Sequence, residues 1–169
     1  NFPFSEALQS RIGVPIRIEN DANCAACGEW HMGIGKKYRN IVTVTIGTGI
    51  GGGVIINNRL CSGNGEFAEI GHMVIQAKNG EKCVCGRYGC FERYASVSAL
   101  IRQASDAAEK NTASRLYKFL KQNNFKLNGK QFFDILDSGC RVCEKVFKEY
   151  IKWLLVGLKN IESIYDPDI

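Results

Sequence analysis

The stretch NIVTVTIGTGIGGGVII, residues 40–56, decides the fold. The β-branched run at 40–46 predicts a strand, and the run at 53–56 predicts a second strand that an Asn57-Asn58 hairpin turn joins to residues 59–61. Glycines between the strands let backbone N–H groups approach an anion, and Thr48 adds a hydroxyl donor. The sequence therefore predicts a phosphate-binding turn, with a purely structural tight hairpin as the alternative. The glycines concerned are Gly47, Gly49, Gly51, Gly52 and Gly53.

The glycine spacing also fits a dinucleotide-binding fingerprint at Gly47, Gly49 and Gly52. That fingerprint requires a helix directly after the glycines, because the helix N-terminus holds the pyrophosphate. Here the glycines lead into another apolar, β-branched run, which is typical of a strand. The dinucleotide interpretation is therefore excluded. A strand, a glycine turn and a strand around a phosphate resemble the arrangement of actin-like ATPase folds.

A second cluster, residues 72–90, has the composition of a closed zinc site. Three thiols and one imidazole are ligand types that Zn²⁺ prefers, and four of them complete a tetrahedron. Gly86 and Gly89 let the backbone fold tightly enough for the thiols to converge. The alternative is disulfides or free buried thiols. The predicted ligands are His72, Cys83, Cys85 and Cys90.

Outside these stretches the chain divides into two halves without a linker between them. Residues 14–19 predict a strand, followed by a helix that Asp21 or Asn23 caps and that ends near Gly33. The second half predicts helices with core-facing apolar stripes, the first of them capped by Ser96. The fold class is α/β, a mixed sheet with one side covered by helices. The expected helices of the second half span about 97–104, 113–120, 130–136 and 140–158.

The composition is that of a globular domain of 169 residues, 45% hydrophobic and 23% charged. No apolar run approaches the ~18 residues that span a bilayer, so no membrane partner is expected. Eight cysteines without a secretory signal indicate a reducing cytoplasm. The net charge of +5 is spread along the chain and does not predict nucleic-acid binding. Two further cysteine pairs fit either small core residues or a second zinc site: Cys24 with Cys27, and Cys140 with Cys143.

Three carboxylates are candidates for chemistry. Asp21 follows the predicted strand and precedes a helix, where it fits two roles equally well, general base on a substrate hydroxyl or helix N-cap. Glu69 lies three residues before His72, and Glu92 two residues after Cys90. The metal loop is expected to bring these two carboxylates close to one point, although most glutamates are simply solvated.

Four motifs in this order resemble the ROK family of repressors and sugar kinases, most strongly between residues 14 and 98. They are Asn-Asp-Ala-Asn at 20–23, Thr-Ile-Gly-Thr-Gly-Ile-Gly-Gly-Gly at 45–53, Glu-Ile-Gly-His at 69–72 and Cys-x-Cys-Gly-x-x-Gly-Cys-x-Glu at 83–92. The resemblance implies an actin-like ATPase (ribonuclease H-like) domain with a zinc-binding loop. It also implies a homo-oligomer.

The resemblance also gives roles to the candidate residues. Asp21 would take the proton from a sugar hydroxyl as the hydroxyl attacks the γ-phosphate of ATP, which binds with Mg²⁺. His72 would face both zinc and sugar, so that the metal is structural and fixes the imidazole. The sugar would be bound by Asn20, Asp21, Glu69, His72 and Glu92, and the nucleotide by Gly47, Thr48, Gly49, Gly51 and Gly52.

The chain departs from the family pattern in two respects. Ala68 stands where many members have glycine. An Asp-x-Gly-Gly-Thr phosphate loop, which opens the family's N-terminal lobe, is not found in this sequence. We therefore expect residues 1–169 to be the larger C-terminal domain, without the N-terminal lobe and the C-terminal adenosine segment, and to be inactive as a kinase alone.

Three functions fit the resemblance. The first is an ATP-dependent sugar kinase of glucokinase type, favoured by Asp21 and the full glycine loop. The second is the sugar-sensing domain of a ROK repressor, which alone would have nucleic acid as a partner through an upstream helix-turn-helix. The third is a bifunctional epimerase–kinase. The sugar is a hexose or N-acetylhexosamine; glucose, N-acetylglucosamine, N-acetylmannosamine, fructose and allose all fit.

Overall fold

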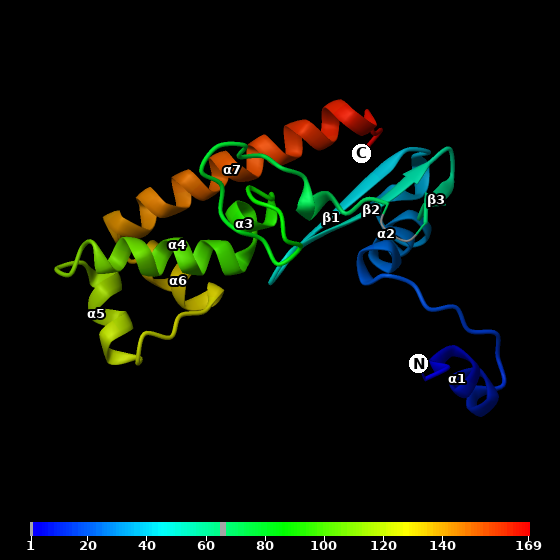
Figure 1. The fold of residues 1–169 in the computed structure, drawn as a ribbon, viewed down its shortest axis with the longest axis horizontal. Helices are drawn as coiled ribbons and strands as arrows, with labels where there is room; N and C mark the ends of the chain where they lie inside the picture. Colours follow the sequence, from blue (N-terminus) through cyan, green and yellow to red (C-terminus); the bar gives the residue numbers. More distant parts are fainter. Residues whose placement is uncertain (1, 65–66) are drawn as a thin grey trace.

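The computed structural model describes residues 2–64 and 67–169 and has a sheet-containing part and a helical part (Figure 1). The long C-terminal helix runs beside the helical part and ends near the sheet. The elements in chain order are α1 (Phe4–Ile12), α2 (Asp21–His31), η1 (Ile34–Lys37), β1 (Ile41–Ile46), β2 (Ile50–Ile56), β3 (Arg59–Cys61), η2 (Ile70–His72), α3 (Glu92–Ala95), α4 (Val97–Glu109), α5 (Arg115–Gln122), α6 (Gly129–Asp137) and α7 (Arg141–Tyr165).

The strands predicted at residues 40–46, 53–56 and 59–61 are present, with bounds shifted by a few residues. β1 pairs antiparallel with β2, with Ile46 opposite Ile50, and β2 pairs antiparallel with β3. The Asn57-Asn58 turn has both residues at positive φ, 51° and 60°, as a two-residue hairpin requires. The prediction of a mixed sheet is wrong for the described strands, which are all antiparallel, because connections of three and two residues allow no parallel crossover.

The glycines of β2 are packing residues. A Cβ on Gly53 would lie 2.5 Å from the Ala22 carbonyl oxygen and 2.6 Å from Ala26 Cβ, so α2 lies directly on the backbone of β2. On the other face, a Cβ on Gly52 would lie 2.6 Å from the carbonyl oxygen of Ala68, just before η2. Elements therefore pack on both faces of the sheet, where the sequence predicted helices on one side.

Two local predictions in the first half are wrong. Residues 14–19 form no strand; they are an irregular, largely exposed segment that leads from α1 to α2, and no described strand pairs with them. The cap of α2 is Asn20, not Asp21 or Asn23: its side-chain oxygen accepts from the Ala22 N–H at 2.8 Å and the Asn23 N–H at 3.4 Å. Asn20 has the extended ψ of 145° that an N-cap needs, whereas Asp21 is already helical.

The predicted helices of the second half are all present. Ser96 caps α4 by accepting from the Ala99 N–H, as the sequence indicated. Their core includes the fully buried Phe91 and Leu100. α7 lies against Phe91, since a Cβ on Gly157 would be 2.2 Å from its ring, and Trp153 packs beside Tyr94 with ring centroids 4.7 Å apart. None of the described helices is long and apolar enough to cross a membrane.

Candidate functional site

The four residues predicted to bind zinc come together in space. One ligand atom from each, the three thiol sulfurs and a ring nitrogen of His72, lies within 4.8 Å of all the others. Cys83 Sγ is 3.5 Å from His72 Nδ1, and Cys85 Sγ is 3.6 Å from Cys90 Sγ. A tetrahedral zinc ion has S–S edges of about 3.8 Å and S–N edges of about 3.6 Å, from bond lengths of ~2.3 and ~2.05 Å. The donor set and its spacing therefore fit Zn²⁺, whereas a disulfide needs sulfurs about 2.05 Å apart.

Tight backbone turns produce this convergence. Gly86 and Gly89 have φ of 87° and 81°, values that favour glycine. A Cβ on Gly89 would also lie 1.9 Å from the Gln76 carbonyl oxygen. The Cys83 N–H donates to the Arg87 carbonyl at 2.8 Å, which closes the turn around Gly86. The glycines predicted to shape the loop are thus required by its backbone geometry.

The three thiols of this group differ in pKa because their surroundings differ. Burial raises the pKa of Cys83 to about 12 and also raises that of Cys90. A hydrogen bond from Arg87 lowers the pKa of the exposed Cys85 thiol to about 6. A bound divalent cation would favour the thiolate form of all three.

Glu92 lies between the candidate metal-ligating group and the glycine turn. Its Oε1 is 3.1 Å from Cys83 Sγ and 3.8 Å from His72 Nδ1. A Cβ on Gly49 would lie 2.8 Å from Glu92 Oε2, so the turn between β1 and β2 approaches the same carboxylate. One side chain at the start of α3 therefore lies between two elements that are more than 20 residues apart in sequence.

Glu69 and His72 line a cleft of about 940 Å³ between η2, the cysteine loop (residues 81–90) and the end of α7. Cys85 and Arg87 form part of the same wall. Ala68, just before Glu69, has φ of 66°, the left-handed conformation in which glycine is favoured. The cleft is large compared with a monosaccharide and has both acidic and basic groups on its surface.

Asn20 and Asp21 begin α2 beside the sheet. A Cβ on Gly51 would lie 3.0 Å from Ala22 Cβ, so this helix end lies next to the start of β2. Asp21 is exposed and its Oδ1 accepts from the Ala22 N–H at 2.8 Å. Because the residue is exposed, its carboxylate is accessible to a ligand.

Glu19 is a residue that the sequence reasoning missed. Its Oε1 accepts from the Asn20 N–H and from Asn23 Nδ2, both at 3.0 Å. The hydrogen bonds from Asn23 and from the Asn20 backbone lower the pKa of Glu19. Glu19 therefore holds the segment that carries Asp21. Its spacing of four residues from Asn23 was the available signal, but an extended segment before a helix cap gave no reason to pair them.

The glycine turn itself consists of Gly47, Thr48 and Gly49. Gly51 and Gly52, predicted with them, belong to β2 and contact Ala22 and the η2 segment. Beyond the turn, a hollow of about 530 Å³ is lined by Gly47 and Thr48, by the first half of α4 as far as Arg102, and by residues 127–129 at the start of α6. The turn thus borders an open space on the side away from the sheet.

The remaining cysteines do not form a second metal group within residues 2–64 and 67–169. Cys140 and Cys143 are buried at the start of α7, which agrees with the core interpretation. Cys27 is half-buried, but Cys24 is exposed, so the core interpretation is wrong for that residue.

The likeness of this domain to solved ROK family structures implies the actin-like ATPase fold. The structure of a ROK family glucokinase from Streptomyces griseus, in complex with glucose and AMPPNP, superposes with a TM-score of 0.83 at 36% identity, over 98% of this chain and 54% of that one. The family model for the ROK family matches residues 1–169. The chain belongs to the ROK family.

Relatives within the family have two kinds of function. A glucokinase from Streptomyces coelicolor is 39% identical over 169 residues, which are 98% of this chain and 53% of that protein. A xylose repressor from Bacillus subtilis is 37% identical over 163 residues, 95% of this chain and 38% of the repressor. The chain spans about half the length of the glucokinases it matches. Glucokinases and xylose repressors therefore share a region that matches this chain.

Proposed function

We propose that this chain is the sugar- and zinc-binding domain of an ATP-dependent hexokinase of glucokinase type. The observation that supports this most is the position of Glu92. It meets the group of His72 and Cys83 on one side and the turn at Gly49 on the other. An element suited to sugar hydroxyls and an element suited to phosphate therefore share one carboxylate, as transfer from ATP to a sugar requires.

In this proposal Asp21 is the general base. Its carboxylate accepts the proton of a hexose hydroxyl while the hydroxyl oxygen bonds to the γ-phosphorus of ATP. The bond between the β–γ bridging oxygen and the γ-phosphorus breaks, and ADP leaves with the electron pair. Asn20, Glu69, His72 and Glu92 hold the other hydroxyls. Fixed orientation of this kind is the main contribution that a protein makes to phosphoryl transfer.

Zinc would have a structural role. His72, Cys83, Cys85 and Cys90 would hold it, and their spacing fits a closed tetrahedral site. When bound, the ion supplies no chemistry to the reaction; it fixes the imidazole. With Nδ1 of His72 directed at Cys83, the other ring nitrogen is left for the sugar.

The nucleotide would bind at the glycine turn. Backbone N–H groups of Gly47 and Gly49 and the hydroxyl of Thr48 suit phosphate oxygens, and the hollow of about 530 Å³ beside them offers space for the rest of the molecule. Mg²⁺ would accompany ATP and neutralise its charge. Gly51 and Gly52 would shape this region through packing, because both lie in β2.

The whole protein would contain more than this domain. Coverage of 53% of the Streptomyces coelicolor glucokinase supports the proposal that residues 1–169 are the larger C-terminal domain of a two-lobed kinase. The other lobe would supply the first phosphate loop. A hexose or N-acetylhexosamine is the proposed acceptor, and assembly into a homo-oligomer stays a prediction.

The alternative is a sugar-sensing domain of a ROK repressor, which the 37% identity to a xylose repressor supports. A sensor needs the sugar ligands but no general base. Asp21, exposed at the start of α2 beside the first residues of β2, is more readily explained by catalysis.

The test is ADP release by the complete protein with MgATP and a panel of hexoses and N-acetylhexosamines. We expect one sugar to be phosphorylated. Asp21→Asn should lower kcat at least about 100-fold, with the sugar Kd changed by no more than about 2-fold, because it removes the base and keeps the shape. Sugar binding without ADP release by the unaltered protein, together with sugar-dependent binding to operator DNA, would support the repressor instead.

A further inference from the structure

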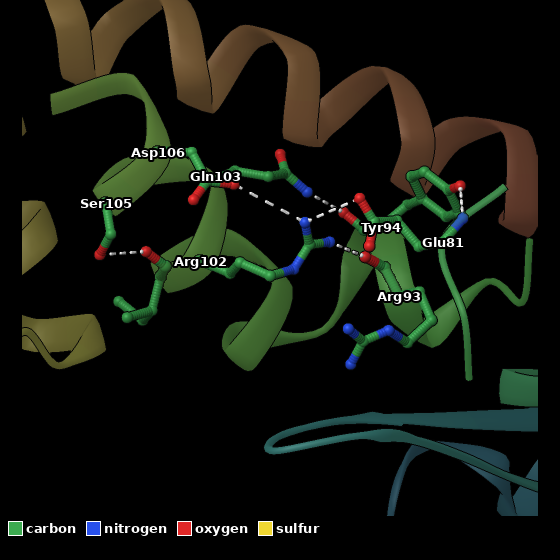
Figure 2. Close-up of polar contacts among 8 residues, drawn as sticks. Glu81, Arg93, Tyr94, Arg102, Gln103, Ser105 and Asp106 are labelled. Carbon is green, nitrogen blue, oxygen red and sulfur yellow. Dashed lines mark hydrogen bonds and ion pairs between the residues drawn. The ribbon is translucent and has the colours of Figure 1, made fainter. Parts of the chain in front are cut away.

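We propose that Arg102, on α4, is a positioning residue for the sugar site: it holds the cysteine loop, residues 81–90, and the start of α3 in fixed relation. The inference rests on the proposed function, since it concerns the same site. Figure 2 shows Arg102 extending from α4 toward Glu81 and toward the backbone of Arg93. Nothing in its sequence position, 12 residues after the last cysteine of the loop, indicates this role.

Arg102 makes two charge-assisted contacts to two different elements. Its Nη2 donates to the Arg93 carbonyl oxygen at 2.7 Å, and its Nη1 donates to Glu81 Oε1 at 3.1 Å. Arg93 lies in α3, a helix of four residues whose carbonyl groups have few partners of their own. The planar guanidinium can reach both acceptors at once, which an ammonium group cannot do with the same geometry.

Each contact is made to a residue that lies within two positions of a site residue in the sequence. Arg93 follows Glu92, whose carboxylate is 3.1 Å from Cys83 Sγ. Glu81 begins the cysteine loop two residues before Cys83, and its carbonyl accepts from the Gly89 N–H at 2.9 Å. A displacement at Glu81 or Arg93 therefore moves the metal-ligating group against Glu92.

Tyr94 supports the same connection. Its hydroxyl accepts from the Glu81 N–H at 2.7 Å, and its carbonyl accepts from Gln103 Nε2 at 2.9 Å (Figure 2). The ring packs against Trp153 of α7. The loop is thus connected to α3, α4 and α7. Arg102 contributes the positive charge that pairs with the Glu81 carboxylate. Asp106, with Oδ2 3.9 Å from Nη1, keeps the guanidinium on this side of α4.

The test compares four variants in the complete protein: Arg102→Ala, Arg102→Lys, Glu81→Gln and, as a matched control, Arg115→Ala. Arg115 also donates to a backbone carbonyl, that of Ser138. It belongs to α5, which lies at the far end of the helical part (Figure 1). The readouts are the Kd for D-glucose, the rate of zinc loss to a chelator, amide hydrogen exchange over residues 81–93, and the KM for MgATP.

We expect Arg102→Ala to weaken glucose binding and to speed zinc loss by roughly 10-fold each. This is the usual scale for residues that orient metal ligands without binding the metal themselves. Exchange over 81–93 should rise. Arg102→Lys should recover only part of each effect, because the three donors of an ammonium group lie at one point and lack the planar fork that reaches two separated acceptors. Glu81→Gln should show a smaller change in the same direction, and Arg115→Ala should leave all four readouts at their original values.

Two results would overturn the inference. If Arg102→Ala and Arg115→Ala gave the same glucose Kd, zinc loss and exchange, Arg102 would have only a general structural role. If only the KM for MgATP rose, Arg102 would serve the neighbouring hollow at Thr48, whose wall it also forms. Should the unaltered protein bind no sugar, the proposed function would fail, while zinc loss and exchange would still decide whether Arg102 positions the loop.

Discussion

Substitution of Gly53 by alanine should displace α2 and with it the proposed base. A Cβ at this position would lie 2.5 Å from the Ala22 carbonyl oxygen and 2.6 Å from Ala26 Cβ, whereas ordinary contacts begin near 3.4 Å. The helix must therefore move by almost 1 Å, because one of the two obstacles is backbone. Ala22 directly follows Asp21, so the same movement reaches the carboxylate.

The expected cost in stability is modest and has a clear sign. Overpacking a tight contact destabilises a protein by about 1–3 kcal/mol. Alanine also has less conformational freedom than glycine in the unfolded chain, which stabilises the folded state by about 0.5–1 kcal/mol. The net destabilisation is about 1 kcal/mol, within a range of roughly 0–2.5 kcal/mol, and 1 kcal/mol lowers Tm by about 2–4 °C for a domain of this size. The effect on catalysis should be larger, up to about 100-fold in kcat, because a misplacement of about 1 Å disrupts a reacting geometry.

One assay is thermal melting followed by tryptophan fluorescence, to which Trp30 contributes; it lies on α2 and packs against the buried cluster of Ala26, Ile41 and Ile55. The other assay is kcat of the complete protein. Gly28→Ala is the matched control. Gly28 lies on the exposed side of the same helix, where an added Cβ would have open space within 4 Å, and the substitution should raise stability by about 1 kcal/mol. If Gly53→Ala melted at or above the original Tm with unchanged kcat, α2 would not be held against β2 as described.

Two further predictions concern the cysteines. Cys85→Ser should lower zinc content well below one ion per chain and reduce Tm, since a closed site loses one of its four ligands. Cys24→Ser, outside the group, should change neither. Equal zinc content in the two variants, measured by mass spectrometry of the metal, would contradict the site. Burial raises the pKa of Cys143 to about 12 from 9.0, so the folded state keeps a proton that the unfolded state loses, and stability should fall as pH rises above about 9 by at most about 1.4 kcal/mol per pH unit. Cys143→Ala should flatten this part of the denaturant-unfolding profile, and an unchanged slope would show that the thiol titrates normally.

Features that depend on neighbours in sequence were predictable. The four candidate metal ligands lie within 19 residues, and their convergence needs only two glycines that turn the backbone. The cap of α4 at Ser96 and the Asn57-Asn58 turn are likewise local, since each satisfies its backbone hydrogen bonds within a few residues. These are the parts in which composition and spacing correspond directly to conformation.

The sequence by itself thus determined the glycine hairpin, the His-Cys₃ group and the helical second half. Only the tertiary structure decided which glycines face the open hollow and which receive α2, because the partner that presses on Gly53 lies about 30 residues earlier in the chain. It also decided that residues 14–19 form no strand, that Glu92 bridges two elements, and that Arg102 reaches Glu81. The physical reason is the same in each case: a side chain's role depends on a partner whose distance in sequence sets no limit on its distance in space.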